Sequence, residues 1–243
     1  AAVTMSAVGL GGEAWFEDLK FRFGIEIGGA LATFAALLFM ARVVDKRGPE
    51  TLGFDPARLL DLLSGALLGA AIFAVPLALL VAIGAARFAP DLGAFSATAL
   101  MLALTICFFN VVTQELLVRS YIFQELWAKY GAAWAIGVTT ALFVALHAAP
   151  ILQGGTPGLI AGANIFLASV MLGLAFVRTN ALWLPIGIHL GWNGLQGPIL
   201  GISVTGTDIG LGGWSVFTFP GDALLTGGTL GVEGGLIGLI GPA

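Results

Sequence analysis

Long stretches without a charged side chain constrain this chain more than any other feature of its sequence. Residues 62–86, 92–114, 130–177 and 179–207 contain no Asp, Glu, Lys or Arg. Each is long enough for one or two membrane crossings, since a helix of about 20 apolar residues spans the hydrocarbon core. Only 10% of the 243 residues are charged, against about 25% in soluble domains. The sequence therefore predicts an integral membrane protein.

The apolar runs also decide between the two structures that can span a bilayer. A spanning segment must satisfy its backbone hydrogen bonds without water, which leaves helices and closed barrels. The runs are continuously apolar rather than alternating, and this favours helices. We predict an all-α, polytopic helical membrane protein with six to seven transmembrane helices around a central polar cavity. The expected crossings are residues 23–44, 59–86, 97 onward, 132–146, 159–177 and 181–196.

No internal repeat and no linker divides the chain, so we expect one membrane domain over residues 1–243. Residues 1–22 mix glycine with charged side chains, as an interfacial lead-in does. Residues 97–196 carry the polar motifs described below and form the expected functional core. Residues 197–243 form a Gly-rich tail, and its apolar part, 230–240, is too short and glycine-broken for a clear seventh crossing. We expect an interfacial loop there with a short or re-entrant segment.

Three polar residues follow the third apolar run at a depth where lipid should exclude them. Gln114, Glu115 and Arg119 lie within residues 110–124. An ionised side chain in hydrocarbon costs roughly 2.5–3.5 kcal/mol on insertion scales, so it is kept only where it faces protein, an opposite charge or water. Glu115 and Arg119 are four residues apart and can pair on one helix face, as a structural ion pair or as part of a site.

Both histidines of the chain also lie in apolar surroundings. His147 follows Phe143 by four residues, and His189 precedes Asn193 by four, so each pair projects from one face of its helix. Either histidine alone could be a hydrogen-bonded core residue. Two histidines at membrane depth favour a shared site.

A hairpin between the third and fourth crossings would bring these motifs together. Gln114 lies 17 residues before Gly131, and His147 lies 16 residues after it. If the chain is helical on both sides of a turn at Gly131, a rise of about 1.5 Å per residue places Gln114 and His147 at nearly the same depth. The sixth crossing would then supply His189 and Asn193 to the same cavity.

Three short motifs carry a resemblance to a known family. Gln114-Glu-Leu-Leu-Val-Arg119, Phe143-x-x-x-His147 and His189-x-x-x-Asn193 occur in this order. They resemble the Glu-Glu-x-x-x-Arg, Phe-x-x-x-His and His-x-x-x-Asn/Asp motifs of the CAAX protease and bacteriocin-processing (CPBP, ABI-type) intramembrane glutamic endopeptidases. Each motif alone is weak, but the three in order on membrane helices are specific, and they cover about residues 97–196.

The resemblance implies a role for each motif residue. The glutamate at the position of Gln114, together with His147, would activate a water for attack on a peptide carbonyl. His189 and Asn193 would stabilise the oxyanion. Arg119 would fix Glu115, and Phe143 would support the site. The resemblance further implies membrane-embedded or lipidated peptide substrates, no metal and no cofactor.

Gln114 departs from the family pattern at the position of the catalytic glutamate. A neutral amide cannot take a proton from water, so the family mechanism should fail as it stands. Three explanations remain open. The chain is an inactivated Glu-to-Gln form, Glu115 acts as the base, or the protein is a natural non-enzyme on a protease scaffold.

Two other function classes also stay open. A metal-dependent intramembrane hydrolase could use His147, His189 and Glu115 as ligands, although the sequence contains no His-Glu-x-x-His motif. A non-enzymatic membrane binding or immunity protein could use the same scaffold.

The distribution of charge limits partners and location. A net charge of −4 argues against a nucleic-acid partner, which leaves the lipid bilayer and a peptide substrate. The most basic loop contains Arg42, Lys46, Arg47 and Arg58, and the positive-inside rule makes it cytoplasmic. We expect an integral protein of the bacterial inner (plasma) membrane.

Overall fold

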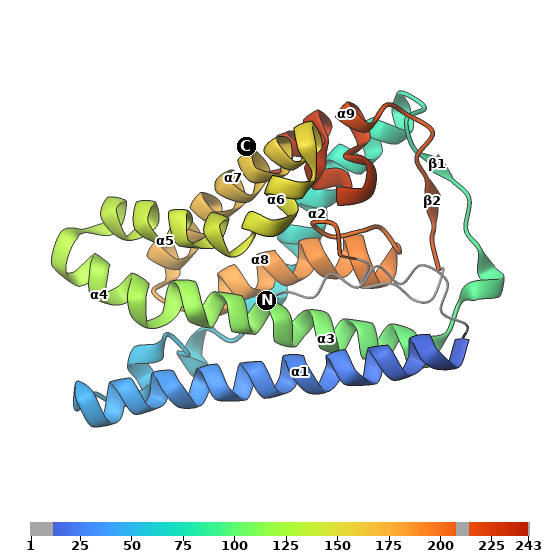
Figure 1. The fold of residues 1–243 in the computed structure, drawn as a ribbon. Coiled ribbons are helices and arrows are strands. Elements are labelled where there is room, and N and C mark those ends of the chain that lie inside the picture. Colours follow the sequence, from blue (N-terminus) through green and yellow to red (C-terminus); the bar gives the residue numbers. More distant parts are fainter. Residues whose placement is uncertain (1–11, 208–213, 243) are drawn as a thin grey trace.

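The structure, a computed structural model, describes residues 12–207 and 214–242, with side chains from residue 20 onward. Helices dominate the described chain, which confirms the predicted all-α class (Figure 1). The helices are α1 Gly12–Phe39, α2 Leu60–Ala82, α3 Ala97–Glu115, α4 Tyr121–Tyr130, α5 Ala132–Leu146, α6 Ala148–Gln153, α7 Gly155–Thr179, α8 Trp183–Gly194 and α9 Ala223–Thr226. Two short strands, β1 Arg87–Phe88 and β2 Phe217–Thr218, pair antiparallel.

Four helical stretches in the described part of the chain are long and apolar enough to cross a membrane. They are Lys20–Val44, Leu60–Ala82, Ala97–Tyr130 and Gly155–Thr179. The other two predicted crossings are also helical but shorter, since α5 has 15 residues and α8 has 12. The predicted helical membrane protein is therefore confirmed, with α5 and α8 as short apolar members of the bundle.

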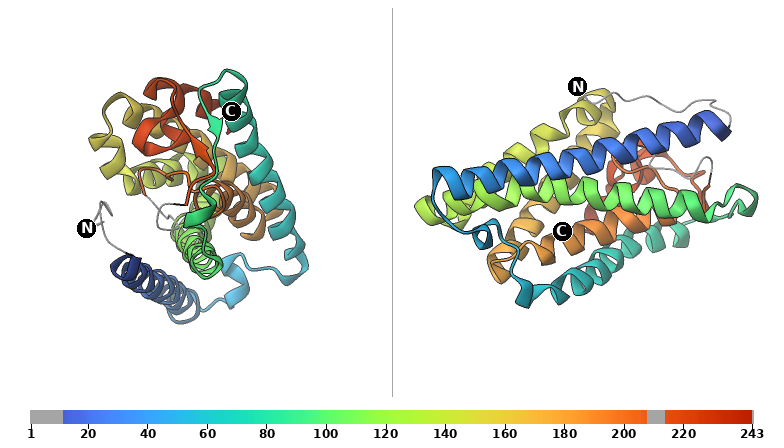
Figure 2. Two further views of the ribbon diagram at one scale, coloured as in Figure 1. Left: turned by 90° about the vertical axis from the view of Figure 1, so that its right-hand side faces the viewer. Right: turned by 90° about the horizontal axis from the view of Figure 1, so that it is seen from below.

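Helix α1 begins at Gly12, within the predicted interfacial lead-in of residues 1–22, while residues 1–11 lie outside the described part. The stretch long and apolar enough to cross, Lys20–Val44, begins close to the predicted crossing 23–44. The apolar run fixes where the membrane segment lies but does not stop the helix from continuing into the more polar stretch before it. Helix α1 then runs along α3 for most of its length (Figures 1 and 2).

Helices α2 and α8 pack closely because glycines face one another. A methyl group added at Gly69 would lie 2.0 Å from the Ile188 carbonyl oxygen, and one at Gly191 would lie 2.1 Å from that of Ala66. One turn along the helices, Gly65 and Gly187 also lie too close to the opposite backbone for a methyl group to fit. Two glycines four residues apart on each helix let the backbones approach, which is how membrane helices gain packing without a hydrophobic driving force. This seam holds α8, the carrier of His189 and Asn193, in place.

The predicted hairpin is present. Helix α3 passes through a π-helical turn, Leu116–Ser120, into α4, which ends at Tyr130 and is followed by Gly131. Gly131 has a φ of 87°, a conformation that favours glycine, and α5 then returns along α4. The wide turn includes Arg119, in keeping with the tendency of π-helical turns to occur at functional sites.

The Gly-rich tail folds back onto the bundle. The apolar stretch expected to be short or re-entrant forms the 3-10 turns Val232–Gly234 and Leu236–Ile240, which pack against α7 and α2. Gly231 makes this fold possible, since it has a φ of 79° and a methyl group there would lie 1.9 Å from the Ser203 carbonyl oxygen. The described tail therefore forms no seventh crossing, and it brings residue 233 to the inside of the bundle.

Candidate functional site

A buried ion pair lies at the centre of the motif-bearing helices. Arg119 Nη1 donates to Glu115 Oε1 at 2.9 Å, and both side chains are 0% exposed. Arg119 Nη2 donates to the Ser169 hydroxyl at 2.6 Å and to the Ser169 carbonyl at 3.3 Å. The predicted pairing of Glu115 and Arg119 is thus present, and it ties α3 to α7.

Glu115 also holds His189. The Nδ1 atom of His189 lies 2.8 Å from Glu115 Oε1, the same oxygen that accepts from Arg119. Because a carboxylate only accepts, Nδ1 carries the hydrogen and the orientation of the ring is fixed. The other oxygen, Oε2, is buried without a hydrogen-bond partner among the described residues. Glu115 is therefore fully enclosed and engaged with two cationic or potentially cationic groups.

The ring of Phe143 contacts Arg119 and both histidines. The guanidinium carbon of Arg119 lies 4.5 Å from the ring centre, within range of a cation–π contact. The rings of His147 and His189 lie 4.7 and 5.9 Å from it, centre to centre. Both imidazoles therefore contact one phenyl ring, as expected if the second and third motifs share a site.

His147 is held in a defined tautomer. Its Nδ1 lies 2.8 Å from the carbonyl oxygen of Phe143, which can only accept a hydrogen bond. Nδ1 therefore carries the hydrogen, and in the neutral ring Nε2 keeps a free lone pair. An imidazole in this state can accept a proton from a water molecule.

One small cavity joins the two histidines. Its volume is about 60 Å³, and its lining includes His147, His189 and Asn193 together with Glu233 of the tail. The remaining lining is largely apolar: Phe143, Asn164, Ile165, Ala168, Met171, Leu172, Ile188, Trp192, Thr205 and Pro242. The cavity has room for water and presents a few polar groups on an apolar wall.

Gln114 lies apart from this lining. Its Nε2 donates to Asn110 Oδ1 at 2.7 Å, and Asn110 Nδ2 donates to Glu26 Oε1 of α1 at 3.2 Å. Its Oε1 is buried and has no partner among the described residues. The expectation that Gln114 and both histidines face one cavity is thus met by His147, His189 and Asn193, while the amide nitrogen of Gln114 is turned toward α1.

Glu233 is the residue that the sequence analysis missed. Its side chain is buried, and Oε1 accepts from Trp192 Nε1 at 3.2 Å. Oε2 accepts from the backbone N–H of Thr205 at 2.6 Å and from its hydroxyl at 2.9 Å. Burial raises the pKa of Glu233 to about 7, because these neutral hydrogen bonds only partly offset the loss of hydration. A carboxylate within the apolar, glycine-broken run 230–240 was the available signal.

Metal binding finds no support in the side-chain arrangement. Among the described residues, no group of three or more His, Cys, Asp or Glu side chains is placed to hold an ion. The set considered from the sequence, His147, His189 and Glu115, instead forms an imidazole–carboxylate hydrogen bond whose oxygen Arg119 shares.

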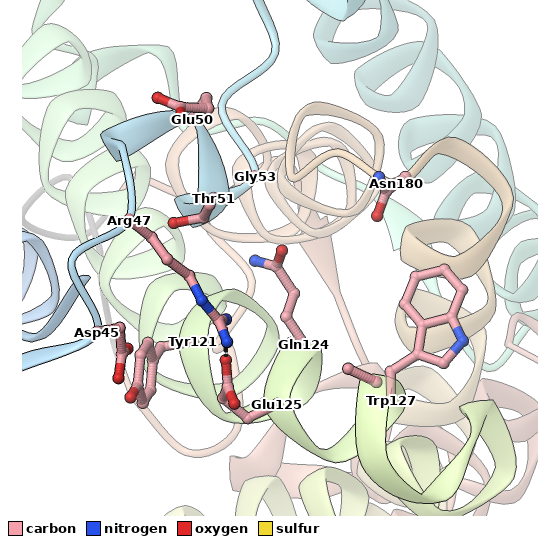
Figure 3. A pocket seen from close by; sticks show the side chains of 11 residues that line it. Asp45, Arg47, Glu50, Thr51, Gly53, Tyr121, Gln124, Glu125, Trp127 and Asn180 are labelled. Carbon is pink, nitrogen blue, oxygen red and sulfur yellow. Dashed lines mark hydrogen bonds and ion pairs between the residues drawn. The ribbon is translucent and has the colours of Figure 1, made fainter. Parts of the chain in front are cut away.

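A second, larger pocket lies where the basic loop after α1 meets α4. It has a volume of about 620 Å³, and its lining comes from that loop, α4 and the end of α7: Asp45, Arg47, Glu50, Thr51, Gly53, Tyr121, Gln124, Glu125, Trp127, Ala128 and Asn180. Figure 3 shows Arg47 paired with Glu125 and Tyr121 beside Asp45. Most of the residues that line this pocket are polar or charged, and the described lining contains no motif residue.

Comparison with known proteins points to one family. Residues 96–195 match the family model described as Rce1-like, type II CAAX prenyl endopeptidase Rce1-like. The matched range contains all three motifs, from Gln114 to Asn193. Neither the curated proteins nor the solved structures gave a significant match. The family match confirms the resemblance that the motifs indicate.

Proposed function

We propose that this chain, which matches the type II CAAX prenyl endopeptidase Rce1-like family model over residues 96–195, is an intramembrane peptidase. Its substrates would be membrane-embedded or lipidated peptides, which reach the site from the bilayer. The bacterial inner (plasma) membrane is the location that we propose. No nucleic-acid partner and no cofactor enter this proposal.

The observation that carries the proposal is the convergence of His147, His189 and Asn193 on one cavity. His147 lies between α5 and α6, whereas His189 and Asn193 lie on α8, far away in the sequence. Polar groups at membrane depth are costly unless they face each other or water. Their shared lining supports a site for chemistry rather than three separate core contacts.

Hydrolysis assigns a task to each of these groups. His147, with the lone pair of Nε2 free, would hold the attacking water by accepting a hydrogen bond from it, while a carboxylate base takes the proton. Asn193 would donate to the oxygen of the tetrahedral intermediate, where negative charge develops, and His189 would do so through Nε2–H in its imidazolium form, since its Nδ1–H faces Glu115. Glu115 would keep His189 in position, with Arg119 as the counter-charge. The proton would then pass to the leaving amine as the peptide C–N bond breaks.

One of the three explanations for Gln114 is that Glu115 acts as the base, and the surroundings of Glu115 bear on it. Glu115 is enclosed and already accepts from Arg119 and His189 through one oxygen. A carboxylate so engaged is suited to positioning His189 and poorly suited to taking a proton from water. We therefore propose Gln114 as the position of the family's base, held here in a Glu-to-Gln form that slows water activation. A non-enzymatic role on the same scaffold is the alternative, and Gln114 is the observation that favours it.

The test is the Gln114→Glu variant in proteoliposomes with a panel of membrane-inserted peptides. General-base catalysis contributes about 100-fold or more, so kcat should rise by about that factor while KM changes little. Gln124→Glu, the same change on α4 in the lining of the second pocket and outside the three motifs, should have no such effect. His147→Ala added to Gln114→Glu should abolish the gain. If no form cleaves any peptide in the panel, the peptidase proposal is wrong and the non-enzymatic role takes its place.

A further inference from the structure

The tail delivers a carboxylate to the cavity of the two histidines. Glu233 lies outside the family-matched residues 96–195, yet it lines the same cavity as His147, His189 and Asn193. The tight turn at Gly231 and the 3-10 turn Val232–Gly234 place it there. The position of Glu233 thus depends on a close backbone approach at Gly231 that leaves no room for a side chain.

The partners of Glu233 leave it available for proton exchange. Its three hydrogen bonds come from Trp192 and Thr205, which are neutral donors. The two oxygens of a carboxylate offer about four acceptor positions, so one remains for a water in the cavity. The other titratable side chains in the described lining are His147 and His189. Glu115 has the opposite environment, with a buried guanidinium on its occupied oxygen.

We propose that Glu233 is an additional catalytic carboxylate of this cavity, which activates water together with His147 in the chain that carries Gln114. This inference rests on the proposed peptidase function and deepens it. Glu233 of the Gly-rich tail would supply the base that is missing at position 114 of the first motif.

The step requires only water and the peptide. Ionised Glu233 takes one proton from a water that is also held by Nε2 of His147. The water oxygen forms a bond to the peptide carbonyl carbon, and the carbonyl electrons move onto the oxygen beside Asn193 and His189. The carbonyl re-forms as the C–N bond breaks, and the proton on Glu233 goes to the leaving nitrogen. The products are a carboxylic acid and an amine, and Glu233 is again ionised.

A purely structural role is the competing explanation, because Glu233 also anchors Thr205 to α8 through Trp192. The two roles respond differently to substitution. Trp192→Phe removes an anchoring hydrogen bond and keeps the carboxylate, whereas Glu233→Gln removes the carboxylate and keeps an acceptor for Thr205. A catalytic role makes Glu233→Gln the more damaging change for kcat, and a structural role gives no such preference.

The decisive experiment compares cleavage by four forms of the full chain: the Gln114 chain, Glu233→Gln, Gln114→Glu and the double variant. In the Gln114 chain, Glu233→Gln should lower the slow kcat about 100-fold with little change in KM, the usual size of a general-base contribution. In the Gln114→Glu background the same change should cost only a few-fold, since a second base is present. Glu233→Asp should restore part of the rate, and Glu50→Gln, an exposed control, should be silent.

The pH profile supplies a signature that a structural role would not produce. Only ionised Glu233 can act as the base, so kcat of the Gln114 chain should rise with pH through an inflection near 7, the value to which burial raises the pKa of Glu233. The inflection should vanish in Glu233→Gln. A Gln114 chain that cleaves equally with and without the carboxylate overturns the inference. So does a Gln114→Glu variant that cleaves while the Gln114 chain is silent.

Failure of the peptidase proposal is recognised separately, because then no variant cleaves. Infrared spectroscopy of the full chain in proteoliposomes still decides whether Glu233 meets cavity water. A protonated carboxyl band absent from Glu233→Gln should shift within seconds of transfer to D₂O if Glu233 exchanges protons with the cavity. Exchange over hours would show a sealed structural carboxyl and would overturn the inference.

Discussion

Two buried carboxylates reach α8 from different parts of the chain, and their partners differ in kind. Glu115, from α3, accepts from the guanidinium of Arg119 and from His189. Glu233, from the tail, accepts only from the neutral groups of Trp192 and Thr205. A charged partner stabilises the ionised form permanently, whereas neutral donors leave the carboxylate able to gain and lose a proton. The comparison separates a positioning group from a candidate acid–base group.

Removal of the charged partner of Glu115 should have the largest effect on stability. Arg119→Ala leaves a buried carboxylate uncompensated, which typically costs about 3–5 kcal/mol. The detergent-solubilised protein should lose far more thermal stability than Arg87→Ala, which changes an exposed residue of β1. Small and equal losses in the two variants would show that the Glu115–Arg119 pair contributes little.

Displacement of Glu233 through the tail backbone should come next. Gly231→Ala adds a methyl group 1.9 Å from the Ser203 carbonyl oxygen, so the turn must move, at a typical overpacking cost of about 1–3 kcal/mol. Gly84→Ala is the matched control, because Gly84 also has a positive φ, 76°, but has no atom within 4 Å of an added methyl group. Thermal melts of the two variants separate the effect of the clash with Ser203 from the strain of an alanine at positive φ. Equal melting temperatures would mean that the tail does not depend on this contact.

Loss of one neutral donor to Glu233 should have a smaller effect. Trp192→Phe removes the hydrogen bond to Oε1, for which about 1 kcal/mol of stability is typical. The hydrogen bond favours the ionised form, so its loss should raise the pKa of Glu233 further above its ordinary range. Infrared titration of the Glu233 carboxyl in Trp192→Phe measures this shift. A lower pKa in the variant would contradict the role assigned to the indole N–H.

The smallest expected effect is on the pH dependence of stability. The pKa of Glu233 is raised from 4.5 to about 7 on folding, so the folded state binds its proton more tightly than the unfolded state does. This contribution to stability is complete below about pH 4.5 and is lost as pH rises through about 7. Glu233→Gln should flatten that part of the stability curve relative to Glu50→Gln. An unchanged slope between these pH values would show that Glu233 folds with an ordinary pKa.

Much of the fold could be predicted because membrane helices can be recognised in the sequence as long apolar runs. The predicted crossing 132–146 coincides with α5, and the hairpin at Gly131 follows from two such runs in series. The start of α1 at Gly12 was missed because a polar helix end carries no comparable signal. The glycine seam of α2 and α8 was also missed, although Gly65 and Gly69 are spaced as a small-residue packing motif.

The site could be predicted only where local motifs carry it. The i, i+4 spacing in Phe143–His147 and His189–Asn193 places each pair on one helix face, and the structure joins them in one cavity. Glu233 could not be placed, because its contact with Trp192 spans 41 residues of glycine-dense tail without a regular period. The hydrogen bond of Asn110, the partner of Gln114, to Glu26 likewise joins α3 to α1, far away in the sequence.

The rate of peptide cleavage by the Gln114→Glu variant decides whether position 114 holds the base of an intramembrane peptidase. The protein in proteoliposomes would be given a membrane-inserted peptide, with kcat measured for the Gln114 chain, Gln114→Glu, and Gln114→Glu with His147→Ala. We predict that Gln114→Glu raises kcat by about 100-fold or more and that the double variant loses this gain. A Gln114→Glu variant no faster than the Gln114 chain, or one that stays active without the His147 imidazole, would contradict it.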